Sequence, residues 1–141
     1  MATYTAGSGG DYATLQTLFA SGVLANGDTA QLQPGYAVVE ACQISGVDNL
    51  TLRGDPSNPS AAVISYNNPA SANYVFALRA DNVSGWLVEG VTLSYTGASS
   101  VYGAAFFGGW SKSVVTFQDC EIHTSGRYAV SYTHLTLPTK A

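Results

Sequence analysis

The amino-acid sequence predicts an all-β protein: a right-handed, single-stranded parallel β-helix, or solenoid, with a short N-terminal capping α-helix and an incomplete C-terminus. Three observations support this fold class. Apolar positions recur at a spacing of 29 residues, a helix-start pattern lies near the N-terminus, and 46% of the residues are hydrophobic while only 10% are charged. Because soluble globular chains usually contain about 25% charged residues, small and polar uncharged residues must cover this surface.

A short amphipathic helix is predicted directly after the Gly-rich turn at residues 8–10. Asp11 is a residue type that favours the N-cap position, and Leu15, Leu18 and Phe19 follow at spacings that place them on one side of a helix. Such a helix would cover the open end of a solenoid and shield the unpaired edges of its first strands.

An internal repeat predicts the solenoid itself. Segment 74–97 falls on segment 103–126 when it is shifted by 29 residues. The shift pairs Ala77 with Phe106, Leu78 with Phe107, Val88 with Phe117, Val91 with Cys120 and Leu93 with Ile122. Stacked coils would bring such residues into ladders with a step of about 4.8 Å. With a looser copy at 50–52 added, the expected ladders are Leu50, Val91 and Cys120, and Leu52, Leu93 and Ile122.

Each copy is expected to contain two short strands joined by a corner. Trp86 and Val88 alternate inward, Gly90 interrupts the alternation, and Leu93 resumes it. A phase change in a period-two pattern moves side chains to the other face unless the chain bends at that point. The turn-rich stretches at 55–60 and 67–69 account for the extra length of the earlier copy.

The chain ends give the predicted domain boundaries. We interpret residues 1–130 as the N-terminal part of one β-helix domain, with a further copy starting at Tyr128. Residues 131–141 resemble the in-frame translation of sequencing-adapter DNA and are predicted to be a non-native tail. The alternative is a native last strand at 135–137, followed by a proline that suits a sheet edge.

The net charge and the length of the apolar runs indicate which classes of partner to expect. The net charge is -4 with five Lys and Arg residues, which predicts neither a nucleic acid nor a membrane partner. No apolar run approaches the roughly 18 residues of a membrane span, and no secretory signal is visible. We expect an extracellular or virion-associated protein.

Cys42 and Cys120 lie in apolar runs on different predicted coils, which favours two buried free thiols.

Four motifs resemble the opening of pectinesterase-like members of the pectin-lyase-like superfamily. These are GSGGDYATLQ at 7–16, LQPGY at 32–36, NLTLRG at 49–54 and AVI at 62–64. The resemblance covers residues 4–130 and implies part of a carbohydrate-associated β-helix protein, one that binds or processes a polysaccharide. Its full-length parent would be a pectinesterase-like esterase or a polysaccharide lyase or hydrolase.

The sequence also differs from the pectinesterase-like pattern at positions that matter for catalysis. The family's glutamine residues are missing beside Tyr102 and after the strand at 120–122, so the resemblance assigns no catalytic residue and the fragment is expected to be inactive. The alternative interpretation is a non-catalytic β-helix of a phage tail fibre, a tailspike or a surface adhesin. A phage-like parent would be a trimer.

Two sets of residues remain as site candidates. Glu121 and His123 are two positions apart on one strand and so share a face, where they could act as an acid and base pair; the alternative is a solvated outer face. The predicted ligand-binding aromatic residues, which could stack on sugar rings, are Phe107, Trp110, Tyr95 and Tyr102; the alternative for these is core or loop packing. No cofactor and no metal are predicted, since Asp119 and Glu121 offer too few oxygens for Ca²⁺.

Overall fold

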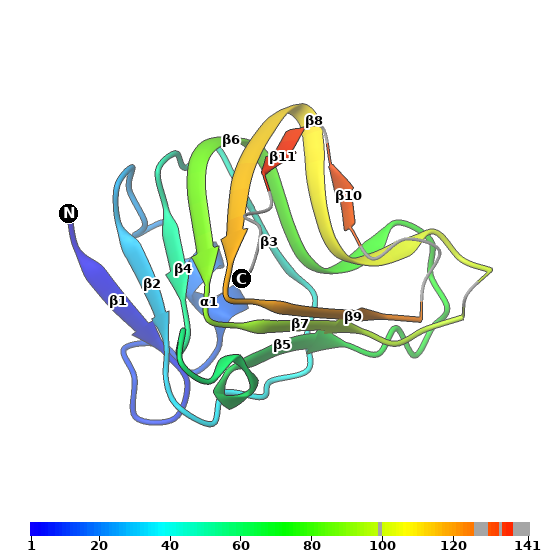
Figure 1. Ribbon diagram of the computed structural model, residues 1–141, viewed down its shortest axis with the longest axis horizontal. Helices are drawn as coiled ribbons and strands as arrows, with labels where there is room; N and C mark the ends of the chain where they lie inside the picture. The colour runs from blue at the N-terminus through cyan, green and yellow to red at the C-terminus, as the bar shows by residue number, and fades with distance from the viewer. Residues whose placement is uncertain (99, 126–129, 133, 137–141) are drawn as a thin grey trace.

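The protein is built mostly from strands in parallel sheets, together with one short α-helix (Figure 1). The computed structural model describes residues 1–98, 100–125, 130–132 and 134–136, with 110–112 and the last two ranges described as backbone only. The larger sheet contains β1 (Thr3–Ala6), β2 (Thr29–Leu32), β3 (Cys42–Ser45), β4 (Thr51–Arg53), β6 (Val75–Glu89), β8 (Gly103–Gln118), β10 (Val130–Tyr132) and β11 (His134–Thr136). The smaller sheet contains β5 (Val63–Tyr66), β7 (Thr92–Tyr95) and β9 (Glu121–Thr124).

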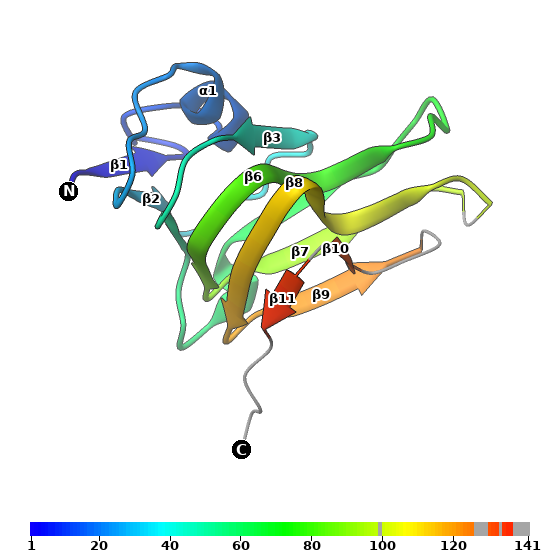
Figure 2. The same cartoon turned by 90° about the horizontal axis from the view of Figure 1, so that it is seen from above.

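The strand order places the long strands at the centre of the larger sheet. Its main path runs β1, β2, β4, β6, β8 and β10, while β3 pairs with the first half of β6 and β11 pairs with the second half of β8. Every strand pairing in both sheets is parallel. Seen from above, β6 and β8 arch side by side over β7 and β9 (Figure 2).

The predicted single-stranded solenoid is wrong. The parallel strands lie in two sheets only, and the sheets are not arranged as a stack of like coils. The sequence spacing between strand partners varies, because Leu52 pairs with Val88 whereas Ile64 pairs with Leu93. In addition, β6 and β8 are 15 and 16 residues long, where coils of short strands were expected. Regular stacking requires near-equal repeats that each contact only their neighbours, and these strands do not provide them.

The pairing register confirms part of the predicted repeat and corrects the rest. Val88 pairs with Phe117 and Leu93 pairs with Ile122, as the spacing of 29 predicts. Leu78, however, pairs with Phe106, one position earlier than predicted. The ladder through Leu93 continues to Ile64 on β5. Leu52 belongs to the larger sheet and is therefore not part of that ladder.

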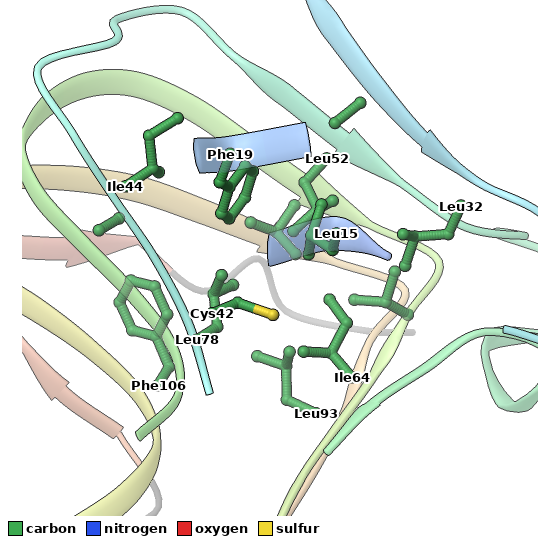
Figure 3. Packing of buried hydrophobic residues seen from close by; sticks show 14 of the residues in the cluster. Leu15, Phe19, Leu32, Cys42, Ile44, Leu52, Ile64, Leu78, Leu93 and Phe106 are labelled. Carbon is green, nitrogen blue, oxygen red and sulfur yellow. The ribbon is translucent and has the colours of Figure 1, made fainter. Parts of the chain in front are cut away.

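The core lies between the two sheets, and side chains from both fill it (Figure 3). Leu78 and Phe106 project from the larger sheet, and Ile64 and Leu93 project from the smaller one. All four side chains are 1% exposed or less. Each fully buried side chain of this size contributes about 1.5–3 kcal/mol, so the contact between the sheets is the main source of stability.

A tight corner connects the two sheets, as the sequence predicts. Strand β6 ends at Glu89 and β7 begins at Thr92, and Gly90 between them has a φ of +67°. The next corner, between β8 and β9, uses Asp119 with a φ of +53°. Aspartate is one of the few non-glycine residues that adopts this conformation readily.

The predicted helix is present as α1 (Leu15–Ala20), with Leu15, Leu18 and Phe19 buried. It packs against β1 and β3. Its N-cap is Thr14, whose hydroxyl accepts a hydrogen bond from the Thr17 amide at 3.1 Å. Asp11 does not cap the helix, because its carboxylate accepts a hydrogen bond from the Thr5 amide at 3.0 Å.

A partly buried polar network joins the start of α1 to the segment that leads into β3. The Tyr36 hydroxyl accepts a hydrogen bond from the Leu15 amide at 2.8 Å, and the Glu40 carboxylate accepts one from the Gln16 amide at 3.0 Å. The Cys42 thiol donates to the same carboxylate oxygen at 3.8 Å. These contacts satisfy amides that the first turn of a helix leaves without partners. Burial, as the largest cause, raises the pKa of both Tyr36 and Cys42.

We predict that the free energy of unfolding falls as the pH rises above about 8.5, the ordinary pKa of a free thiol. The folded state keeps the Cys42 proton because its pKa is raised, whereas the unfolded state releases it. The loss approaches about 1.4 kcal/mol per pH unit for one group, and Tyr36 adds to it above about pH 10. Urea unfolding between pH 7 and 10.5 measures the effect.

The Cys42→Ala variant is the control for this profile. It removes the Cys42 thiol, so its stability is expected to fall less steeply above about pH 8.5 than that of the wild-type protein. The remaining fall comes from Cys120, whose pKa burial also raises, and then from Tyr36. Identical profiles for the wild-type protein and this variant would show that the buried thiol does not control the alkaline stability.

Candidate functional site

One outer surface of the larger sheet collects aromatic and polar side chains from β3, the start of β6, β8 and the turns before them. We call this surface the outer face and define it by Gln43, Ser45, Tyr74, Phe76, Arg79, Asp81, Tyr102 and Phe107. At its rim, Tyr74 is 65% exposed and its ring lies 5.0 Å from that of Tyr102. The Tyr74 amide donates to the Tyr102 carbonyl at 2.6 Å, which fixes the two residues side by side.

A second aromatic pair lies next to the tyrosines. The rings of Phe76 and Phe107 are stacked, with centroids 4.5 Å apart and planes 16° from parallel. Phe76 is buried, while Phe107 is half-buried. Gly109 makes room for the Phe107 ring, because a Cβ atom at that position would lie only 2.8 Å from it. Phe107 therefore lies flat along the sheet rather than projecting into solvent.

Arg79 and Asp81 bring charge to the centre of the outer face. The Arg79 guanidinium lies 5.2 Å from the Phe107 ring centroid, and its Nε donates to the Asp81 carboxylate at 2.8 Å. The register of β3 and β6 sets Gln43 beside Arg79 and Ser45 beside Asp81, and both β3 side chains are exposed. Hydrogen-bond donors and hydrogen-bond acceptors thus both lie next to the aromatic rings of the outer face.

Two shallow hollows meet at Gln43. One, of about 60 Å³, is lined by residues that include Cys42, Gln43, Tyr74, Phe76 and Arg79. The other is more open, has about 370 Å³, and is lined by Gln16, Phe19, Gln43, Ile44 and Ser45. Aromatic side chains line the first hollow and mostly polar ones line the second.

The structure brings together only some of the aromatic residues that were predicted to bind a ligand. Phe107 and Tyr102 both lie on the outer face. Tyr95 is 0% exposed, and its hydroxyl accepts a hydrogen bond from the Asn68 amide group at 2.6 Å, so its ring offers no surface to a ligand. The backbone of Trp110 belongs to β8, but its side chain lies outside the described residues.

Glu121 and His123 do share one face of β9, as the period-two pattern predicts. The His123 Nε2 atom lies 3.6 Å from a Glu121 carboxylate oxygen, and the two side chains are 63% and 55% exposed. They belong to the smaller sheet, whereas the outer face belongs to the larger one. This geometry supplies a solvated pair of side chains with no described aromatic partner.

Another hollow, of about 290 Å³, lies beside the turn between β4 and β5, but its polar groups already serve the fold. The Gln31 side chain donates to three backbone carbonyls, including that of Arg53 at 3.2 Å. Hydrogen bonds from the Ser57 hydroxyl and amide lower the pKa of Asp55. The side chains here hold the turn, so they are a poor candidate for ligand recognition.

Metal and membrane features were sought in the same part of the chain. Within the described residues, no three or more His, Cys, Asp or Glu side chains gather closely enough to hold a metal ion. Asp119 lies at the corner before β9 and Glu121 on that strand. None of the described helical structure has the length and apolar character needed to cross a membrane.

Sequence reasoning missed the residues that complete the outer face, namely Gln43, Ser45, Tyr74, Phe76, Arg79 and Asp81. A repeat of 28 rather than 29 would have found part of it, because that shift places Tyr74 on Tyr102. Arg79 and Asp81 carried a second signal, since they are opposite charges two positions apart after an apolar run and so share one face of the strand.

Comparison with known protein families, characterised proteins and solved structures returns no match for this chain.

Proposed function

We propose that this chain is a carbohydrate-binding protein that holds a polysaccharide or glycan chain on the outer face. The observation that carries the proposal is the pair of neighbouring ring contacts, Tyr74 with Tyr102 and Phe76 with Phe107, beside exposed polar side chains. Sugar rings have apolar faces that stack on aromatic side chains and hydroxyl groups that need directed hydrogen-bond partners. The outer face offers both kinds of group on neighbouring strands.

The composition and the N-terminal motifs also support a carbohydrate ligand. Only 10% of the residues are charged, so the surface is dominated by hydroxyl, amide and aromatic groups, which suit uncharged polar ligands better than nucleic acid or acidic lipid. The motifs that resemble pectinesterase-like proteins point to the same class of ligand. The proposal concerns only the binding of a glycan at the outer face. Such binding would serve a polysaccharide-processing enzyme and a surface adhesin alike.

The proposal assigns no catalytic step. Glu121 and His123 are more than half exposed and lie on the smaller sheet, so they have no common surface with the proposed binding residues. General acid and base catalysis requires groups within hydrogen-bond reach of the bound substrate. We therefore expect the purified chain to cause no hydrolysis or elimination on polysaccharides, including pectin.

Affinity electrophoresis and isothermal titration calorimetry against a panel of soluble polysaccharides test the binding. We expect Tyr74→Ala and Phe107→Ala each to weaken binding about five- to tenfold, because each removes a stacking surface worth about 1 kcal/mol. Tyr74 is the cleaner position, since its side chain is largely exposed and its loss should not disturb the core.

The matched control is Tyr12→Ala, a half-buried tyrosine near β1 and away from the outer face. It should bind as the wild-type protein does, and circular dichroism should show all three variants folded. The proposal fails if no polysaccharide binds the wild-type protein, or if Tyr74→Ala and Phe107→Ala both bind with unchanged affinity.

A further inference from the structure

The ion pair at the centre of the outer face has an unusual combination of burial and incomplete hydrogen bonding. Arg79 and Asp81 are joined at 2.8 Å, and their side chains are only 19% and 10% exposed. The other Asp81 carboxylate oxygen, Oδ1, is buried and has no hydrogen-bond partner among the described residues. A buried polar atom without a partner costs about 1–3 kcal/mol, so a missing donor would stabilise this arrangement.

The chemistry of that missing donor follows from the atom it must reach. A carboxylate oxygen accepts hydrogen bonds and attracts hydroxyl groups, whereas it repels a second carboxylate. Ser45 lies beside Asp81 in the register of β3 and β6, with its exposed hydroxyl on the neighbouring strand. A ligand hydroxyl that binds at the exposed Ser45 side chain would lie beside the Asp81 carboxylate, and a small side-chain shift would bring the hydroxyl to the buried Oδ1 atom.

Charge balance points in the same direction. The positive charge of Arg79 is compensated by Asp81, and that of Arg53 is compensated by Glu89 at 3.6 Å. These are the only Lys or Arg side chains in the part of the chain whose side chains are described. The whole chain carries a net charge of -4. A polyuronide, with one carboxylate on each sugar, would meet a protein of net negative charge whose two described Arg side chains are already paired with carboxylates.

We infer that the ligand of the outer face is a neutral polysaccharide. The Arg79–Asp81 pair hydrogen-bonds to the hydroxyl groups of this polysaccharide, and the aromatic rings stack on the faces of its sugar rings. This inference rests on the proposed carbohydrate-binding function and narrows it to one class of glycan. In this arrangement Arg79 packs on Phe107 and fixes the Asp81 carboxylate. Gln43 and Ser45 on β3 then provide exposed polar contacts, with Asp81 beside them on β6.

The experiment compares neutral and acidic probes on the folded chain. The neutral probes are galactomannan, arabinoxylan, mixed-linkage β-glucan and dextran, and the acidic probes are polygalacturonate and alginate. Affinity is measured by titration calorimetry at low and at moderate NaCl concentrations. We expect binding to at least one neutral probe, with an affinity that changes less than twofold with salt, and no binding to either acidic probe.

Variants then test the role of the ion pair. Asp81→Asn is expected to weaken binding of the neutral probe at least fivefold, because it removes the charged acceptor with little change of shape. Glu89→Gln is the matched control, since it breaks the other ion pair of β6 away from the outer face, and it should bind normally. Ser45→Ala, at an exposed position that does not threaten folding, should weaken binding about threefold; this keeps the inference testable if Asp81→Asn unfolds.

The outcomes separate this inference from the proposed function. Binding of polygalacturonate or alginate that is lost at moderate salt, and that still depends on Tyr74 and Phe107, would overturn the inference and leave the carbohydrate-binding proposal standing. Unchanged binding of the neutral probe by both Asp81→Asn and Ser45→Ala would likewise overturn it. If no probe binds, the proposed function itself fails.

Discussion

Replacing Trp86 with alanine is expected to lower the free energy of unfolding by about 3–5 kcal/mol, the range found when a large aromatic side chain is removed from a core. Trp86 is 1% exposed, and its ring centroid lies 6.5 Å from that of Phe19 on α1. Its indole N–H donates to the Val47 carbonyl at 2.6 Å. One side chain therefore connects the helix, the chain between β3 and β4, and the second half of β6.

Urea unfolding measures this change. It is monitored by far-UV circular dichroism, because the substitution removes a tryptophan and so alters the fluorescence signal. Trp86→Phe should lose less than Trp86→Ala, because it keeps most of the buried surface and gives up the hydrogen bond. Leu87→Ala, the half-buried neighbour on the other face of the same strand, is the control and should cost clearly less than either. A Trp86→Ala protein as stable as Leu87→Ala would mean that α1 does not depend on this contact.

The parts of the fold that the sequence predicts correctly are those with a local cause. Leu15, Leu18 and Phe19 are buried because helical spacing places them on one side. The corner at Gly90 follows from the break in alternation, and the pairing of Val88 with Phe117 follows from the repeat. For the helix and the corner, neighbouring residues alone determine the side-chain direction, and the repeat extends this to the pairing of Val88 with Phe117.

The parts that the sequence predicts wrongly depend on which sheet a strand joins. Leu50-Thr51-Leu52 resembles Val91-Thr92-Leu93, yet Leu52 pairs with Val88 and Leu93 pairs with Ile64. An apolar, polar, apolar triplet has the same period in either sheet, so alternation cannot distinguish the two. The turn around Pro59 separates β4, in the larger sheet, from β5, in the smaller one. Two sheets therefore formed where equal coils were expected.

The candidate site was only partly predictable for a similar reason. Phe107 and Tyr102 stand out as aromatic residues close to glycines, but Tyr95 is also two positions from a glycine and lies in the core. Exposure depends on how the sheets curve around the core, which the local sequence does not encode. The Arg79–Asp81 pair was visible as a charge pattern, whereas its position against Phe107 arises only when β6 and β8 are aligned.

The second large effect is expected at the corner between the sheets. Gly90→Ala should lower the free energy of unfolding by about 2–5 kcal/mol, combining the cost of a left-handed conformation with that of overpacking. Gly90 has a φ of +67°, and a Cβ atom there would overlap the backbone of Asp55 and Pro56. That backbone cannot easily move away, because the Asp55 amide donates to the Gly90 carbonyl at 2.8 Å.

Gly46→Ala separates the two causes of this effect. Gly46 has a φ of +75°, but a Cβ atom at that position would meet nothing within 4 Å, so only the conformational cost of about 1–2 kcal/mol remains. Urea unfolding of the two variants under the same conditions should therefore give a clearly larger loss for Gly90→Ala. Equal losses would show that the turn at Asp55 and Pro56 yields to the added methyl group. The close contact between that turn and the corner would then not be what fixes the two sheets relative to each other.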